Sequence, residues 1–383
     1  MDVDWFQDQV VYQIFIDRFA GFEDTDNWHN PQFVGGDLQG IIDRLDYIEK
    51  LGIDVIWISP FYETSAYHGY HITDYYSVDE RFGTEEDLKE LIEEVHDRDM
   101  RIIAGFVPNH VSREHPFFQD AIHDPSSDYR DWFTFKEWPD EYLRFLDFDQ
   151  LPKLNLENPE ARHHVIEAAK HWLDLGLDGY RLDHVVGPSN GFWNHFRSEI
   201  KSQHPDAVLI GEAWLSGVQK SQLETLNIPH PLIQWITGSQ ERVQRNYRDI
   251  LTGVLDFRGS KLVKKAVSSE HLSPLYRALL DLHYRLYPDD FALPNFLDNH
   301  DMNRILYQFD QDKQKLKDAF RIMRDQNRPT VIYYGTEVGM TQYQGIEEFD
   351  KYGDLQARKP MQWDDKDEDL LEFFRKEIRK KRF

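Results

Sequence analysis

The stretch Gly179-Tyr180-Arg181-Leu182-Asp183-His184 indicates both the fold and the chemistry of this chain. It follows an amphipathic segment, residues 159–175, whose apolar positions recur at helical spacing and which ends before Gly176. Alternation along a strand places the side chains of Arg181 and Asp183 on the same side. A paired arginine keeps a carboxylate ionised and fixes its orientation, as a nucleophile requires. The alternative interpretation is a structural ion pair at a helix–strand junction.

Composition narrows the classes of protein to which the chain can belong. The 383 residues include no cysteine, and 69 acidic against 44 basic residues give a formal net charge of −25. This excludes disulfides and thiolate catalysis, and it argues against nucleic acid or an anionic membrane as a partner. No apolar run approaches the roughly 20 residues of a membrane span. The acidic start lacks the basic and apolar regions of a signal peptide, so we expect a cytoplasmic protein.

Short apolar segments alternate with helical patterns along the chain. Strands are predicted over residues 10–14, 54–59, 101–107, 180–183, 208–211, 232–235, 292–297 and 330–334. Helices are predicted over residues 37–51, 84–99, 159–175, 191–203, 311–324 and 370–381. Eight strands favour a closed (β/α)8 TIM barrel over an open doubly wound sheet, and no glycine-rich phosphate loop follows the first strand.

Two long segments interrupt this alternation, and a further loop follows the second strand. Residues 111–157 separate the third strand from its helix and are rich in aromatic and charged residues, so we expect a small subdomain over the barrel mouth. The barrel then consists of residues 1–110 and 158–383. Residues 61–82, rich in Tyr, His and Gly, and the irregular residues 335–364 are predicted to be loops.

Reactive side chains follow four of the predicted strands. The C-terminal strand ends of a barrel gather at one mouth, where its active site lies. The four ends carry Asn109 with His110, Arg181 with Asp183, Glu212, and His300 with Asp301. Any one of these could be a satisfied structural group, but four together indicate a functional site.

Three carboxylates in one mouth favour glycoside hydrolysis. Crowded like charges raise one pKa and leave another low, so one acid can protonate the leaving group while another attacks. Asp183, held by Arg181, suits the nucleophile. Glu212 has no cation next to it in the sequence and suits the general acid. Asp301 and the neighbouring histidines would grip sugar hydroxyls. The chain shows no serine or cysteine nucleophile elbow and no His-x-x-x-His zinc motif.

These residues resemble the four signature regions of the α-amylase family of glycoside hydrolases. The matching motifs are Val107-Pro108-Asn109-His110, Gly179-Tyr180-Arg181-Leu182-Asp183, Gly211-Glu212-Ala213-Trp214 and Phe296-Leu297-Asp298-Asn299-His300-Asp301. The resemblance implies a retaining mechanism on α-glucosidic bonds, with Asp183 as nucleophile, Glu212 as acid/base and Asp301 as transition-state stabiliser. By the same resemblance, the sugar next to the scissile bond is bound by Tyr70, His110, Arg181, His300 and Arg304.

A fifth motif and three departures refine this resemblance. Leu151-Pro152-Lys153-Leu154-Asn155 is similar to the form found in neopullulanase, cyclomaltodextrinase and maltogenic amylase. Calcium-binding relatives commonly carry an acid where this chain has Lys153, so no cofactor is expected, with Asn109 left as a candidate metal ligand. Gly105 stands where the family usually has an aspartate. Neither the N-terminal sugar-binding domain nor the C-terminal β-sandwich of many relatives is expected in these 383 residues.

The resemblance predicts a hydrolase of α-1,4-glucans such as starch, maltodextrins or cyclodextrins. A transglycosidase would use the same residues, so the two remain open at this point. A non-catalytic glycan-binding barrel would have lost the carboxylates, whereas all three are present. The linkage preference, endo or exo cleavage and assembly into a homo-oligomer are left open.

Overall fold

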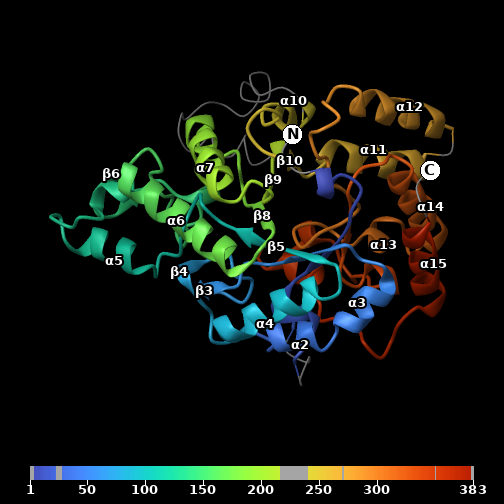
Figure 1. The fold of residues 1–383 in the computed structure, drawn as a ribbon, viewed down its shortest axis with the longest axis horizontal. Helices are drawn as coiled ribbons and strands as arrows, with labels where there is room; N and C mark the ends of the chain where they lie inside the picture. Colours follow the sequence, from blue (N-terminus) through green and yellow to red (C-terminus); the bar gives the residue numbers. More distant parts are fainter. Residues whose placement is uncertain (1–3, 23–27, 216–239, 270, 350, 381–383) are drawn as a thin grey trace.

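A closed barrel of eight parallel strands forms the centre of the molecule (Figure 1). The computed structural model describes residues 4–22, 28–215, 240–269, 271–349 and 351–380. In sheet order the strands are β10 (Gly253–Val254), β9 (Val208–Gly211), β8 (Gly179–Leu182), β5 (Arg101–Phe106), β2 (Val55–Ile58), β1 (Val10–Ile14), β12 (Thr330–Tyr333) and β11 (Asn295–Phe296). A parallel bridge between Gly253 and Ala292 joins the two ends of this order. The predicted (β/α)8 barrel is thereby confirmed.

Helices surround the barrel and begin and end at recognisable signals (Figure 1). The longer ones are α3 (Leu45–Leu51), α4 (Glu85–His96), α6 (Pro159–Leu175), α7 (Asn190–Gln203), α11 (Phe257–Ser268), α12 (Ser273–Tyr284), α14 (Lys313–Arg324) and α15 (Glu368–Arg379). Thr84 and Asp87 form a capping box at the start of α4. Gly52 ends α3 in the left-handed conformation (φ 93°) that glycine adopts without strain.

The structure corrects two predictions of secondary structure, and a third falls outside its described residues. The helix expected over residues 37–51 is divided into α2 (Leu38–Ile42) and α3. Residues 61–82 are no plain loop, because β3 (Tyr62–Thr64) and β4 (Ile72–Val78) pair in antiparallel fashion there. The strand predicted at 232–235 lies outside the described residues, and β10 occupies the place beside β9.

Alternation along the strands separates two apolar layers. Inward-facing Val11, Trp57 and Ile210 belong to a cluster inside the barrel, whereas the intervening Tyr12 and Ile56 pack with the helices outside. The interior cluster comprises Phe6, Val11, Val55, Trp57, Ile103, Val208, Ile210, Leu255, Ala292, Phe296 and Val331. Towards the C-terminal strand ends, the inward positions turn from apolar to polar, so a polar site lies on an apolar floor.

Residues 111–157 leave the sheet between β5 and β8 and extend to the side of the barrel (Figure 1). They contain α5 (Pro116–His123) and the antiparallel pair β6 (Phe135–Glu137) and β7 (Glu141–Tyr142). An aromatic cluster holds this segment together: the Phe118 ring lies 4.8 Å from the rings of both Phe133 and Tyr142. A bridge between His110 and Lys153 ties its two ends to each other at the barrel mouth.

Candidate active site

One buried guanidinium connects two carboxylates at the mouth of the barrel. Arg181 is fully buried, and its Nη1 lies 2.5 Å from Asp183 Oδ1. Its Nη2 forms an ion pair with Glu212 Oε1. The two acids follow β8 and β9, which pair in register at Leu182 and Gly211, so they come from adjacent strand ends. Arg181 and Asp183 thus share a face as predicted, and Glu212 shares their cation although none is next to it in the sequence.

The surroundings of Glu212 and Asp183 raise the pKa of both carboxyls. Burial raises the pKa of Glu212 to about 7; Arg181 lowers it, and the charges of Asp183 and Asp301 raise it further. Burial also raises the pKa of Asp183, against the lowering by Arg181. The backbone N–H of His184, a residue in the left-handed region (φ 43°), donates to Glu212 Oε2 at 3.2 Å. A carboxyl with a pKa near neutrality can exchange a proton during a reaction.

Asp301 differs from these two acids because two cationic or polar partners hold its ionised form. Arg358 Nη2 lies 2.8 Å from Asp301 Oδ1, and His300 Nε2 lies 3.1 Å from Oδ2. Burial raises the pKa of Asp301, but His300, Arg358 and Arg181 lower it by more, so the net direction is down. Its side chain is 48% exposed, so the carboxylate is accessible from the mouth.

Neutral aromatic groups flank the carboxylates. The Tyr70 ring stacks on His300 with 5.2 Å between centroids and an interplanar angle of 11°. Burial lowers the pKa of His300 to about 3. Its Nδ1 lies 2.9 Å from the Gln13 side-chain nitrogen. With that amide donating to Nδ1, the neutral ring carries its proton on Nε2 and donates it to Asp301.

The segment 111–157 contributes an aromatic side chain to the site. Phe145 stacks on His110 at 4.4 Å, and its ring meets His184 edge-on at 4.5 Å. Burial, together with the charges of His184, His71 and Lys153, lowers the pKa of His110 well below its usual value. His110 is therefore a neutral, buried group beside the carboxylates rather than a counter-ion for them.

Arg304 lies in a different position from the other predicted binders. It is fully buried, and it donates to the carbonyl oxygens of Ala357 (2.9 Å) and Tyr334 (2.5 Å). Its guanidinium also lies 4.1 Å from the Tyr333 ring. These contacts fix the chain that follows β12, and the role of Arg304 in sugar binding stays a prediction.

Sequence reasoning missed Arg358, which lies in the irregular segment 335–364. Besides Asp301, its guanidinium contacts the carbonyl oxygen of His300 (2.8 Å), the Tyr67 hydroxyl (3.0 Å) and the carboxylate of Asp354. The only sequence signal was the Asp354–Arg358 spacing of four in a segment that follows the last strand. Because this segment has no periodic pattern, the sequence did not indicate that the Arg358 side chain lies at the barrel mouth.

The side chain of Asn109 lies against a histidine. Its amide nitrogen lies 3.2 Å from His110 Nδ1, and the backbone of His110 forms an antiparallel β-bridge with that of Lys153. Across the described part of the chain, no group of three or more His, Cys, Asp or Glu side chains is arranged to hold a metal ion.

Gly105 has a steric reason for being glycine. A Cβ at this inward position of β5 would lie 2.8 Å from Cδ and 3.0 Å from Cγ of Pro60. The aspartate expected from the resemblance would therefore require Pro60 to move.

Within the described ranges given above, no helix is long and apolar enough to cross a membrane.

Comparison with known proteins agrees with this geometry. Alpha-amylase 2 from Dictyoglomus thermophilum is 37% identical over 381 residues, covering 98% of this chain and 63% of the relative. A cyclomaltodextrinase from a Bacillus species is 33% identical, covering 98% of this chain and 66% of the relative. The ligand-free cyclic α-maltosyl-(1→6)-maltose hydrolase from Arthrobacter globiformis superimposes with a TM-score of 0.83 at 29% identity, covering 99% of this chain and 83% of that structure.

The chain spans about two thirds of the length of the curated relatives that it matches (63% and 66%). The sequence pattern of the alpha amylase catalytic domain matches residues 13–370. That match includes each strand from β2 to β12 and all three carboxylates of the mouth. The chain therefore belongs to the α-amylase catalytic domain family.

Proposed function

We propose that the protein is a retaining glycoside hydrolase that cleaves α-1,4-glucosidic bonds in starch, maltodextrins or cyclodextrins. One observation carries the proposal: Asp183 and Glu212, from adjacent strand ends, contact one buried guanidinium. Retaining enzymes need two carboxyl groups close together, roughly 5 Å apart. The relatives named alpha-amylase and cyclomaltodextrinase support the choice of substrate class.

The two acids would divide the chemistry between them. Glu212, with a pKa of about 7, is partly protonated at neutral pH and gives its proton to the departing glycosidic oxygen. Asp183, whose Oδ1 accepts from Arg181, attacks the anomeric carbon and forms a glycosyl ester. Glu212 then takes a proton from water, which breaks the ester and restores Asp183.

The remaining groups would stabilise and position the sugar. Asp301 stays ionised because Arg358 and His300 hold it, so it can face the positive charge that develops on the sugar ring. Tyr70 and His110 lie beside the carboxylates as neutral groups and can bind sugar hydroxyls. Arg304 would act indirectly, by fixing the chain after β12.

We also propose that folding requires no calcium. Lys153 next to His110 supports this, because a cation there opposes a second cation. The unfolding temperature should be equal in excess calcium and in excess chelator. A chelator-dependent drop of several degrees would contradict this proposal and leave the catalytic one untouched.

Product analysis tests the main proposal. We would incubate the protein with starch, pullulan and a cyclodextrin, and follow the anomer first released by NMR. The proposal expects α-anomers, because two displacements retain configuration. First release of β-anomers, or no cleavage of any α-glucan by folded protein, would refute it. Products longer than the substrate would identify the transglycosidase alternative, which uses the same residues.

A further inference from the structure

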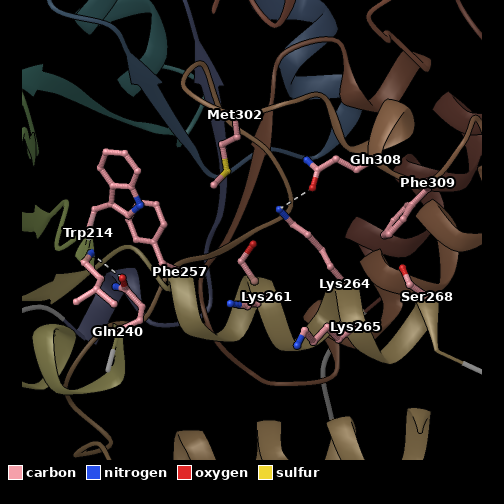
Figure 2. A pocket seen from close by; sticks show the side chains of 12 residues that line it. Trp214, Gln240, Phe257, Lys261, Lys264, Lys265, Ser268, Met302, Gln308 and Phe309 are labelled. Carbon is pink, nitrogen blue, oxygen red and sulfur yellow. Dashed lines mark hydrogen bonds between the residues drawn. The ribbon is translucent and has the colours of Figure 1, made fainter. Parts of the chain in front are cut away.

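A pocket of about 480 Å³ lies between helix α11 and the segments that follow β9 and β11 (Figure 2). It is lined by Trp214, Phe257 and Met302, which follow the C-terminal ends of β9, β10 and β11. Trp214 comes two residues after Glu212, and Met302 directly follows Asp301. Its volume lies in the usual range of small-ligand pockets, roughly 300–1,000 Å³. If Glu212 protonates the departing oxygen, the pocket wall formed by Trp214 and Met302, which follow Glu212 and Asp301 closely in the sequence, lies towards the leaving group.

The far wall of the pocket is strongly basic. Helix α11 contributes Lys261, Lys264 and Lys265, whose spacing of three and four places them on neighbouring positions of one helix face. Among the residues that the structure describes, none of the three forms an ion pair with a carboxylate, and Lys265 Nζ lies 5.5 Å from the centre of the Tyr276 ring. Like charges at this spacing repel one another. A basic wall without carboxylate partners is unusual in a chain with a net charge of −25.

Lys264 extends from the helix into the pocket towards Gln308 (Figure 2). Its Nζ lies 3.4 Å from the Gln308 side-chain oxygen, a long and neutral contact. Burial lowers the pKa of Lys264 to about 8, and the charge of Asp298 only partly opposes this. An anion at Nζ would offset the loss of hydration of this ammonium group.

Ser260 adds a buried hydroxyl to the pocket wall. Its side chain is 2% exposed and lines the pocket, and its Oγ has no hydrogen-bond partner within the described ranges. Most buried polar atoms are hydrogen-bonded, so an unpaired hydroxyl in a pocket wall indicates a missing ligand. On the opposite wall, Trp214 is exposed and can stack on a sugar ring.

We propose that this pocket binds an anionic group, phosphate or carboxylate, carried by the sugar on the leaving-group side of the scissile bond. Trp214 would stack on that sugar, while Lys264 and Ser260 would bind the anion. Lys261 and Lys265, which are exposed, would attract it to the mouth. This inference rests on the proposed function, since it names the leaving group of the same reaction.

Three matched disaccharides test the inference: maltose, maltose phosphorylated on the 6-hydroxyl of its reducing glucose, and glucose α-1,4-linked to glucuronic acid. We expect kcat/KM for at least one anionic disaccharide to exceed that for maltose on the order of tenfold, the value of one charge-assisted hydrogen bond. The advantage should shrink with added salt. The phosphorylated and carboxylated substrates separate the two sources of negative charge.

The Lys264→Gln variant should bring the anionic-to-neutral ratio of kcat/KM close to one. Lys89→Gln, an exposed lysine on α4, is the matched control and should keep the wild-type ratio. Equal rates on all three disaccharides in the wild type, or an unchanged ratio in Lys264→Gln, would overturn the inference and leave the proposed function standing. Folded protein that cleaves neither these disaccharides nor maltodextrins would instead overturn the proposed function.

Discussion

Buried acids at neighbouring strand ends of this barrel have different partners: a pair of acids follows β8 and β9, and a single acid follows β10. At β8 and β9, Asp183 and Glu212 share one guanidinium. After β10, Asp256 Oδ1 accepts from the N–H of Gly259 (2.8 Å), from His283 Nε2 (2.9 Å) and from Gln244 (3.0 Å).

The pKa values at the two sites are therefore shifted in opposite directions. Burial raises the pKa of Asp256, but His283 and the hydrogen bonds lower it by more, so the net direction is down. The pKa of Glu212 instead rises to about 7, because burial and two neighbouring carboxylates outweigh Arg181. Burial alone does not decide the direction of a pKa shift. An acid whose partners outweigh its burial has a lowered pKa, and an acid crowded by other carboxylates has a raised pKa and can exchange protons near neutral pH.

The largest expected effect separates chemistry from stability. Glu212→Gln should lower kcat/KM on maltodextrins on the order of a thousandfold, since it removes the proton donor. The glutamine can still contact Arg181, so the free energy of unfolding should stay within about 1 kcal/mol of wild type. Steady-state kinetics and urea unfolding measure the two quantities. A variant with near-wild-type turnover would remove Glu212 from its proposed role.

Asp256→Asn should show the reverse pattern. It breaks a fully buried pair with His283 and should lower the free energy of unfolding by about 3–5 kcal/mol. Turnover of the protein that remains folded should change little. Asp249→Asn, an exposed acid (83%), is the control and should change stability by less than about 0.5 kcal/mol. Equal stability of the two variants would contradict the contrast between the clusters.

The pH dependence of stability offers a finer check on the Asp256–His283 pair. The pKa of His283 is raised: burial lowers it, but Asp256 raises it by more. Its contribution is complete below the unfolded value of about 6.5 and is lost as pH rises through the raised pKa. Because the pKa of Asp256 is lowered, its carboxylate stabilises the folded state fully above about pH 3.9. That contribution is lost as the pH falls through the lowered pKa. The stability difference between wild type and Asp256→Asn should thus peak between these limits.

Arg358→Lys tests how the third acid is held. Lysine keeps the charge but cannot contact Asp301, Tyr67 and the His300 carbonyl at once. We expect kcat to fall on the order of tenfold to a hundredfold, since small displacements at a reacting centre are costly. The acid limb of the pH–rate profile should move upward, because the pKa of Asp301 rises when its partner retreats. A profile identical to wild type would show that Arg358 is not needed for Asp301.

The smallest effect concerns pH alone. Because Glu212 must donate a proton, kcat/KM should fall about tenfold per pH unit above its pKa of about 7. The alkaline limb measured on a neutral maltodextrin reports this value. In Arg181→Lys the limb should shift, since Arg181 lowers the pKa of Glu212. A limb that starts above pH 9 would contradict the crowded-acid description.

Periodic patterns in the sequence were sufficient for most of the framework. The predicted ranges of β1, β9 and α6 coincide with the observed Val10–Ile14, Val208–Gly211 and Pro159–Leu175, because buried strands and capped amphipathic helices carry strong local signals. The sixth strand, β10, has only two residues, too few for any periodicity. The sequence did not predict the hairpin of β3 and β4, because its residues are mixed in polarity and show no clear alternation.

The sequence by itself determined the barrel, the family and the three carboxylates at strand ends, since all of these depend on local spacing. Only the tertiary structure decided how these acids are partnered: that Arg181 serves both Asp183 and Glu212, that Arg358 returns from the segment after β12 to hold Asp301, and that lysines of α11 face Trp214. The physical reason is that pKa values and binding depend on distances through space. Those distances join residues far apart in the sequence, 57 positions for Asp301 and Arg358 and 291 for Tyr67 and Arg358, where no local pattern can show them.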